Sequence, residues 1–317
     1  MRIKKSMVLF MAFMLLGVAA KVGAVERLSL ATGGTAGTYY PIGSAIASIV
    51  MKHVPDLELT AESTGASVAN IRMLQSKRVE FIMAASNTSW GAYQGHEPFK
   101  DAPVKNIRGM ASLYPEVFQF IVLEDSGLKT MRDLKGKRVA VGAPGSGTER
   151  TANMVLEAHG ITYDDIDEQF LNFGEAVTAL KDGLIDCAIV GSGIPTSAVV
   201  DASASLHVQL LSVDRDVMEK FLVDIPYLAM IVIPGGIYRG VDEDVVTVAS
   251  PAILSAEADV PDELVFNILK ALFGNLDELS ASHAQGKMIR LETALNAMSI
   301  PLHPGAQRFY RSVGMSK

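Results

Sequence analysis

Two segments rich in glycine and threonine have the composition of an anion-binding loop. Segment 33–40 (GGTAGTYY) follows the strand-like residues 28–31, and segment 142–148 (GAPGSGT) follows the strand-like residues 138–141. If each segment opens a helix, its unpaired backbone N–H groups and the positive end of the helix dipole can receive a carboxylate. Glycines let the backbone approach a solute, and Ser or Thr hydroxyls add donors. The alternative is ordinary helix capping, in which these hydroxyls satisfy only their own helix.

A third segment, 63–70 (STGASVAN), has the same character and stands between a strand pattern and a helix pattern. We expect it to face the same cleft as the other two. Loops of this kind, one on each side of a cleft, could hold the two ends of a dicarboxylate without a cationic side chain.

Motifs for catalysis are absent from the sequence. It contains no Gly-x-Ser-x-Gly elbow, no His-Glu-x-x-His and no phosphate loop ending in Gly-Lys-Ser/Thr. The six histidines are scattered, and His53 and His159 fall near predicted helix ends, where a histidine is commonly a capping or surface group. We therefore expect a binding protein with no catalytic residue, no metal site and no cofactor.

Strand and helix patterns alternate along the chain. Residues 57–62 alternate between apolar and polar, which predicts a half-buried strand, whereas residues 42–50 repeat apolar side chains at helical spacing behind Pro41. Residues 265–279 predict one long helix that is opened by Pro261 and two acids. This alternation predicts an α/β protein with mostly parallel sheets.

A weak internal repeat divides the chain. Leu74 is followed by an apolar run that ends at Ser86, and Leu180 is followed at the same spacing by an apolar run that ends at Ser192. Each unit is preceded by one of the glycine-rich loops. Ligands of open parallel sheets bind beyond the carboxyl ends of the strands. Two such units therefore predict two lobes that face each other across a cleft.

The chain is expected to cross between the lobes twice. Residues 107–123 predict two extended segments with a turn near Tyr114-Pro115, and residues 227–233 predict another extended segment. If these are paired crossovers, residues 25–112 and 235–317 form the first lobe and residues 113–234 form the second.

Residues 1–24 have the pattern of a secretory signal peptide. A basic start precedes the apolar run 7–20, and Val22-Gly23-Ala24 offers a cleavage site near Ala24. The alternative is a membrane anchor, but a run of about 14 residues is short for a bilayer that needs about 20. No later segment has the roughly 18 unbroken apolar residues of a membrane span. We therefore expect export to the periplasm without membrane insertion.

The net charge limits the classes of partner that we expect, and the cysteine content limits the possible disulfides. Residues 1–24 hold four cations and no acids, so the remaining chain has a formal charge of −11, with 24 basic and 35 acidic side chains. An acidic exported chain has no electrostatic reason to bind nucleic acid. The single cysteine, Cys187, excludes an internal disulfide and is expected to be a small buried apolar residue. We expect a monomer.

At family level the sequence resembles the TAXI branch of solute-binding receptors for tripartite ATP-independent periplasmic (TRAP) transporters. The resemblance covers nearly the whole chain after residue 24, in the family's order. It is carried by GGTAGTYYPIG (33–43), ESTGASVANIRML (62–74), LYPEVFQFIV (113–122), VGAPGSGTE (141–149), the stretch 233–265 and LHPGAQRFYR (302–311).

The resemblance implies a two-lobed, type II periplasmic-binding-protein fold that delivers a small carboxylate solute to an ion-driven permease. The implied solutes are glutamate-like amino acids and 2-oxoglutarate-like dicarboxylates. Carried over by position, the implied ligand-binding residues are Gly34, Thr35, Gly37, Thr38, Tyr39, Ser63, Ser67, Pro144, Gly145, Ser146, Gly147 and Thr148, with Tyr114 and Gly193 as further candidates.

One segment departs from the family pattern. After the third strand the family is expected to have a sequence close to Gln-Ser-Asp, whereas this chain has Ala85-Ser86-Asn87. Ser86 and Asn87 are included as candidate ligand-binding residues. Because Asn87 is neutral, a site without that acid has lost a partner for a substrate ammonium. This departure favours a keto acid or simple dicarboxylate over an amino acid.

The sequence therefore predicts a receptor that closes around a small carboxylate and passes it to a TRAP permease. Two alternatives remain. A periplasmic sensor would bind the same solute and signal to a membrane protein, and an enzyme on the same scaffold would turn the solute over.

Overall fold

The computed structural model describes residues 25–225 and 227–315, so the predicted signal peptide lies outside the described residues. The strands are β1 (Glu26–Ala31), β2 (Leu57–Glu62), β3 (Phe81–Ala85), β4 (Ile107–Leu123), β5 (Arg138–Ala140), β6 (Asp167–Gln169), β7 (Cys187–Ser192), β8 (Val208–Leu211), β9 (Ala229–Ile233) and β10 (Val245–Glu257). The α-helices are α2 (Tyr39–His53), α3 (Ser67–Gln75), α4 (Ser86–Gln94), α5 (Gly147–Ala158), α6 (Phe173–Lys181), α7 (Ser197–Ser205), α8 (Arg215–Phe221), α9 (Asp262–Gly274), α10 (Leu276–Ser282) and α11 (Pro304–Ser312).

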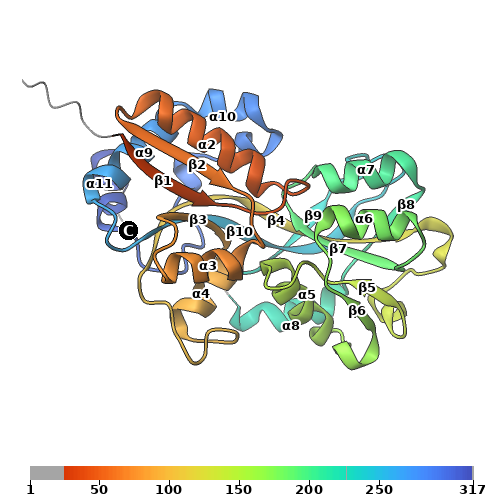
Figure 1. The fold of residues 1–317 in the computed structure, drawn as a ribbon. Helices are drawn as coiled ribbons and strands as arrows, with labels where there is room; N and C mark the ends of the chain where they lie inside the picture. The colour runs from red at the N-terminus through yellow and green to blue at the C-terminus, as the bar shows by residue number, and fades with distance from the viewer. Residues whose placement is uncertain (1–24, 226, 316–317) are drawn as a thin grey trace, which may run out of the picture.

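The strands follow the order β2-β1-β3-β10-β4-β7-β5-β6, with β8 paired to β4 and β9 paired to β10. β1, β2 and β3 are mutually parallel, as are β5, β6 and β7, whereas β4 and β10 run antiparallel to their neighbours. Figure 1 shows two α/β lobes side by side, one built on each parallel set. The predicted α/β class with two lobes is confirmed.

The two lobes repeat one arrangement. The order β2-β1-β3-β10 in the first lobe matches β6-β5-β7-β4 in the second. In each lobe the central parallel strand leads through a glycine-rich loop into a helix, α2 or α5. The helix-turn-strand repeat predicted from Leu74 and Leu180 corresponds to α3–β3 and α6–β7. It places the polar strand ends Ser86 and Ser192 at equivalent points of the two lobes.

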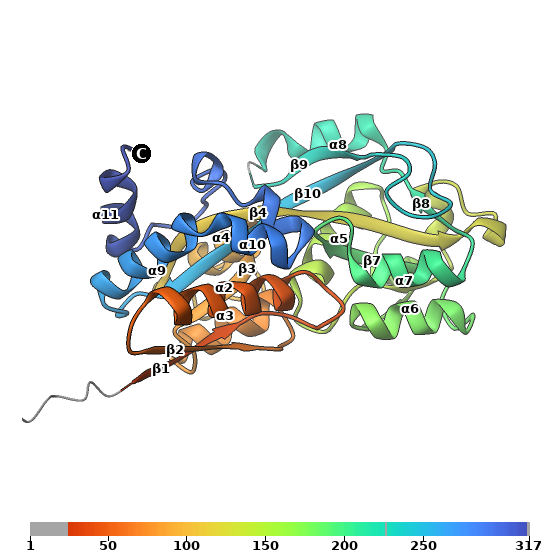
Figure 2. The same cartoon turned by 90° about the horizontal axis from the view of Figure 1, so that it is seen from above.

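β4 and β10 pass through both lobes, as the view from above shows (Figure 2). The predicted turn near Tyr114-Pro115 is wrong, because β4 is one continuous strand of 17 residues. Pro115 lies directly opposite Pro251 of β10, next to a register irregularity. Proline lacks a backbone N–H. Where the two prolines face each other, neither strand has an N–H group that needs an acceptor. Both strands can therefore continue through this point.

The predicted long helix at 265–279 is interrupted. α9 ends at Gly274, and Asn275 leaves helical geometry (φ −135°, ψ 39°) before α10 begins at Leu276. The Asn275 amide donates to the Ala271 carbonyl over 2.7 Å, which satisfies one acceptor at the end of α9. The apolar pattern continues across the break because both helices pack on the same core.

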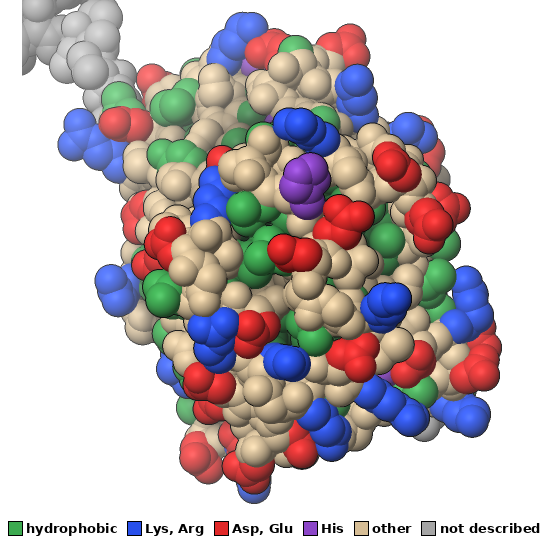
Figure 3. Space-filling view, turned by 90° about the vertical axis from the view of Figure 1, so that its right-hand side faces the viewer, with side chains coloured by type: hydrophobic (Ala, Val, Ile, Leu, Met, Phe, Trp, Pro, Cys, Tyr) green, Lys and Arg blue, Asp and Glu red, His purple; other side chains and the backbone are tan. Residues whose placement is uncertain are grey.

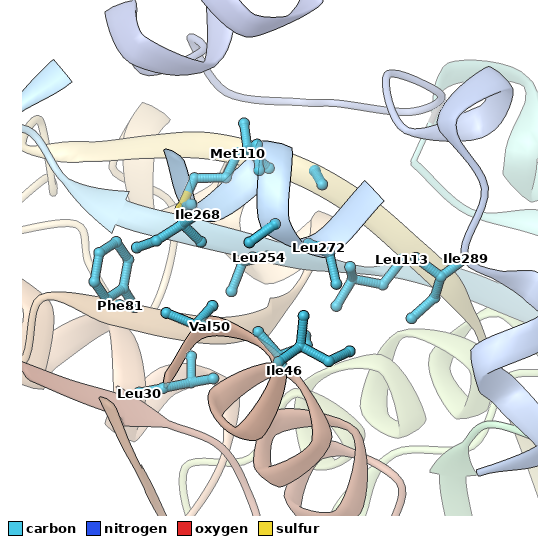
Figure 4. Close-up of a cluster of buried hydrophobic side chains, with 14 of the residues drawn as sticks. Leu30, Ile46, Val50, Phe81, Met110, Leu113, Leu254, Ile268, Leu272 and Ile289 are labelled. Atoms are coloured by element: carbon cyan, nitrogen blue, oxygen red, sulfur yellow. The ribbon is translucent and has the colours of Figure 1, made fainter. Parts of the chain in front are cut away.

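Each lobe has its own buried apolar layers. In the first lobe, α2 and α9 cover one face of the sheet, and α3 and α4 cover the other. Figure 4 shows the first of these layers, in which Ile46 and Val50 of α2 face Leu272 of α9 beside the strands. In the second lobe, α6 and α7 cover one face, and α5 and α8 cover the other. Cys187 is fully buried in this second lobe, as expected for an apolar residue.

The hydrophobic layers bear on where the lobes divide. Those of the first lobe use residues up to Tyr114 and from Ala252 onward, and those of the second use residues 117–249. Tyr238 and Val245 therefore pack in the second lobe, although the sequence placed the return to the first lobe at residue 235. We propose that the chain returns near Pro251.

Candidate solute-binding site

A cavity of about 520 Å³ lies between the two lobes. The first lobe contributes residues 33–39 and 63–67 to its lining, and the second contributes residues 143, 144, 146–148, 172–175, 191 and 192, with Glu116 where β4 passes between them. None of these lining residues is Lys, Arg or His. The volume suits a small molecule.

Four helices begin at the cavity wall. The first residues of α2, α3, α5 and α6 all contribute to the lining. The first turn of a helix has backbone N–H groups without intrahelical acceptors and carries about half a positive charge. Four such ends around one cavity make it attractive to an anion without any cationic side chain.

The first glycine-rich loop does not use its threonine for capping. Thr38 is the N-cap residue of α2, yet its side chain makes no capping hydrogen bond. Its hydroxyl lies 2.9 Å from the Ser192 hydroxyl, and its backbone N–H donates to the same oxygen over 3.2 Å. Ser192 ends β7 of the second lobe. The loop therefore connects the lobes across the cleft, and the capping alternative does not hold at this position.

The second glycine-rich loop combines both roles. Ser146 caps α5 by accepting from the backbone N–H of Glu149 over 3.0 Å, as the capping alternative expects. The Gly145 carbonyl accepts from the backbone N–H groups of Val68 and Ala69 in the first lobe, over 3.2 and 3.3 Å. Gly145 has φ +71°, a conformation that favours glycine. This loop therefore also joins the lobes.

The segment 63–67 holds the first lobe's wall in place. The Ser63 hydroxyl donates to the Gly33 carbonyl over 3.1 Å, and the Ser67 hydroxyl accepts from the backbone N–H of Ala85 over 3.0 Å. Between them, Ala66 has φ +68° and ψ −147°, which is rare for a residue with a side chain. The strained conformation places the start of α3 against the cavity.

Glu116 is the acidic side chain buried within the site. It is only 8 % exposed, and its Oε2 accepts a hydrogen bond of 2.8 Å from the Tyr39 hydroxyl. Burial raises the pKa of Glu116 to about 8, and the bond from Tyr39 lowers it only in part. Burial, followed by the charge of Glu116, raises the pKa values of both Tyr39 and Tyr114 well above their ordinary range. Both phenols are therefore neutral.

Most of the residues predicted for the site lie together. The predicted residues that line the cavity are Gly34, Thr35, Gly37, Thr38, Tyr39, Ser63, Ser67, Pro144, Ser146, Gly147 and Thr148. Their roles in binding remain predictions.

The other five predicted residues lie outside the lining. Ser86 is buried and donates to the Ala297 carbonyl over 2.7 Å. Asn87 is buried and donates to the Thr151 hydroxyl of the second lobe over 2.7 Å. Tyr114 is buried beside Glu116. The carbonyl of Gly145 accepts from the start of α3, and Gly193 lies against the side chain of Gln285. The argument from Asn87 to the charge of the solute therefore has no support from the cavity lining.

Sequence reasoning missed several lining residues, most notably Glu116, Ser192 and the segment 172–175. The sequence contains a signal for Glu116 and another for the segment 172–175. Glu116 is the single acid in the apolar stretch 113–122, and Asn172 with Glu175 forms a capping box at the start of α6. In that box the Asn172 side chain accepts from the backbone N–H of Glu175, and the Glu175 carboxylate accepts from the backbone N–H of Asn172.

Within 25–225 and 227–315, no three His, Cys, Asp or Glu side chains are placed to hold a metal ion. No helix in the same ranges has both the length and the apolar character needed to cross a bilayer.

The fold is shared with proteins of known structure. The complex of PhnD1 from Prochlorococcus marinus with methylphosphonate has a TM-score of 0.55 at 11 % identity, over 90 % of this chain and 98 % of that one. A protein from Bordetella bronchiseptica RB50 has a TM-score of 0.54 at 18 % identity, over 90 % and 89 % of the two chains. A putative L-cystine ABC transporter protein from Listeria monocytogenes has a TM-score of 0.50 at 14 % identity, over 85 % and 98 %.

These likenesses show the two-lobed, type II periplasmic-binding-protein fold that the sequence predicted. The family model matches over residues 30–314, which include both lobes and every residue that lines the cavity. The chain belongs to the NMT1-like family.

Proposed function

We propose that this protein is an exported receptor that closes around a small carboxylate solute and delivers it to a membrane permease. The observation that carries the proposal is the convergence of four helix starts on one interlobe cavity that has no cationic side chain in its lining. A buried carboxylate needs donors for each oxygen. The N–H groups of Val68, Ala69 and Glu149 already donate within the protein, and the remaining first-turn N–H groups of these helices can supply the donors.

Closure of the lobes completes the proposed site. Lining residues come from both lobes, so a solute in the cavity bridges them. The bonds between Thr38 and Ser192 and between Gly145 and α3 also join the lobes in this closed form. A solute that contacts both lobes binds the closed form more tightly than the open form and shifts the population toward it. Micromolar affinity corresponds to about 8 kcal/mol, which several charge-assisted hydrogen bonds can supply.

Delivery to a TRAP-type permease is the finer part of the proposal. It is supported by the resemblance of segments such as 33–43 and 141–149 to TAXI receptors, and by the signal-peptide pattern of residues 1–24. The end of the second lobe, shown in Figure 3, has acidic and basic side chains interspersed, so this face has no single-sign patch that would identify a docking surface.

A thermal-shift screen of the protein without residues 1–24, purified free of ligand, tests the binding proposal. The panel contains glutamate, glutamine, 2-oxoglutarate, succinate, fumarate, simple sugars and phosphate. A rise of several degrees in Tm that is confined to carboxylates supports the proposal. A response to sugars alone, or no response to any carboxylate, contradicts it. Uptake of the solute into vesicles that contain the candidate permease, dependent on this protein, distinguishes transport from sensing.

A further inference from the structure

The cavity contains a carboxyl group, that of Glu116, which no cationic side chain of the described residues neutralises. Glu116 accepts one hydrogen bond, from the Tyr39 hydroxyl. Within 25–225 and 227–315, no Lys, Arg or His lies within ion-pair distance of its carboxylate. An ionised carboxylate that is buried without a cation is costly, so this group must either keep a proton or meet a cation from the solute.

The other acid in the lining does not share this property. The carboxylate of Glu175 accepts from the backbone N–H of Asn172 over 2.9 Å, in the capping box of α6. That bond explains why an acid occupies position 175 on structural grounds alone. Glu116 caps no helix: it is carried by β4 at the point where the chain passes between the lobes, and its one hydrogen bond comes from a neutral phenol.

The position of Glu116 is rigid. Its backbone pairs with Ser250 of β10, and its side chain is held by Tyr39 of α2. The buried Tyr114 hydroxyl, two residues earlier on β4, has no hydrogen-bond partner among the described residues. The carboxylate therefore lies at a defined place in the cavity wall, held by the one phenol that donates to it.

We propose that Glu116 determines solute specificity by accepting from a protonated nitrogen, so that the solute is a zwitterion with both a carboxylate and an ammonium group. This inference rests on the proposed function. The carboxylate of the solute would meet the helix starts, and its ammonium would meet Glu116. A keto acid offers no cation, and it would leave Glu116 to keep its proton.

The titratable groups that face Glu116 are Tyr39 from α2 and Tyr114 from β4, and Glu175 of α6 lines the same cavity. Burial raises the pKa values of both phenols, so they stay neutral below pH 10. Because the pKa of Glu116 itself is about 8 in the closed protein, binding of an ammonium at pH 7 should displace a proton from this carboxyl. No bond forms or breaks other than that O–H bond, and the proton passes to the buffer.

The test uses glutamate and 2-oxoglutarate, which share a carbon skeleton and differ by an ammonium against a keto group. Isothermal titration calorimetry measures both with the protein without residues 1–24 and with its Glu116→Gln variant. We expect glutamate to bind the wild-type protein at least tenfold more tightly than 2-oxoglutarate does. We expect Glu116→Gln to weaken glutamate by 100-fold or more while changing 2-oxoglutarate less than threefold. In buffers of different ionisation enthalpy, glutamate binding at pH 7 should release up to one proton and 2-oxoglutarate binding should release none.

Glu257→Gln is the matched control, because it neutralises another buried acid, at the end of β10, that lies outside the cavity lining. It should change glutamate affinity less than threefold. If Glu116→Gln does not fold, Tyr39→Phe is used in its place, and the decisive measurement is the proton release of the wild-type protein. If glutamate binding at pH 7 releases no proton, the inference is overturned.

The outcomes separate the two proposals. Tight binding of 2-oxoglutarate or succinate with no binding of glutamate or glutamine overturns the inference and leaves the carboxylate receptor in place. Equal glutamate affinity of the wild-type protein and Glu116→Gln also overturns it. If no carboxylate binds the wild-type protein, the proposed function fails, and the inference fails with it.

Discussion

The hydroxyls of Thr38 and Ser192 lie 2.9 Å apart across the interlobe cleft, and the Thr38 backbone N–H donates to the same serine oxygen over 3.2 Å. Thr38 begins a helix in the first lobe, and Ser192 ends a strand in the second. The pair thus joins the first glycine-rich loop of one lobe to the polar strand end of the other. Bonds of this kind form only when the lobes are closed.

Ser192→Ala should weaken closure. It removes the acceptor of the Thr38 N–H and leaves the Thr38 hydroxyl, which is 2 % exposed, without this partner in the closed form. Loss of such bonds costs about 1–3 kcal/mol. We therefore expect a solute affinity about 5- to 150-fold lower, measured by calorimetry, with a ligand-free Tm within a few degrees of the wild-type value.

Ser203→Ala is the control for this change. Ser203 is also buried in the second lobe, but its hydroxyl bonds only to the Val200 carbonyl of its own helix. A Ser203 variant that loses as much affinity as Ser192→Ala would contradict a role for the Thr38–Ser192 contact in closure.

Gly147→Ala should hold the lobes apart. A Cβ on Gly147 would lie 2.6 Å from Oγ of Ser67 and 3.2 Å from Oγ1 of Thr88, both in the first lobe. Since each lobe can fold without that contact, we expect a normal circular dichroism spectrum together with loss of ligand-induced compaction in small-angle X-ray scattering.

Gly34→Ala provides the matched comparison at the same cavity, because a Cβ there meets nothing within 4 Å. The Gly34 variant should still compact on addition of solute. Full compaction of the Gly147 variant would show that the lobes do not approach as closely in solution.

Asn87→Asp should act on the lobe interface and not on solute choice. The Asn87 amide donates to the Thr151 hydroxyl, whose own hydrogen is committed to the Gly147 carbonyl over 2.9 Å. A carboxylate at position 87 would face an oxygen that has no hydrogen to donate. We expect a loss of about 1–3 kcal/mol in the free energy of unfolding at neutral pH, measured by urea denaturation.

The same variant should lower glutamate and 2-oxoglutarate affinity by similar factors, in contrast to the unequal effect that follows if Asn87 contacts the solute. Asn296→Asp, at an exposed position, is the control and should leave stability within about 0.5 kcal/mol. If Asn87→Asp lowers the affinity for only one of the two solutes, Asn87 contacts the solute.

The stability of the ligand-free protein should depend on pH through Glu116. Burial raises the pKa of Glu116 from 4.5 to about 8, so the closed protein retains a proton that the unfolded chain releases between these values. A native state that binds more protons loses stability as pH rises, here by up to about 1.4 kcal/mol per pH unit. Opening of the cleft would solvate the carboxylate and reduce this loss.

Thermal unfolding of the wild-type protein and Glu116→Gln from pH 4.5 to 9 measures the effect. Relative to the glutamine variant, the wild-type Tm should fall as pH rises to about 8 and then level off. A constant difference in Tm over that range would show that Glu116 is already ionised in the folded protein, and would place a solvated carboxylate in the cleft.

The sequence by itself determined the local parts of this protein. Alternating patterns at 57–62 and helical spacing at 42–50 predicted β2 and α2, because the apolar period follows directly from which face of an element is buried. The repeat at Leu74 and Leu180 and the glycine-rich loops predicted two similar lobes and most of the cavity wall. These features are encoded within short segments, so one sequence suffices to find them.

Only the tertiary structure decided which of those residues meet. Thr38 and Ser146 both stand at helix starts in similar loops, yet one bonds across the cleft and the other caps its own helix. Asn87 lies just after the end of β3, and Ser192 lies at the end of β7, but Asn87 contacts Thr151 and lies outside the cavity lining. Glu116 enters the site because β4 runs straight through the point where a turn was expected. Such contacts join residues that are 64 to 154 positions apart, and their pairing depends on how the two lobes pack, which no local pattern specifies.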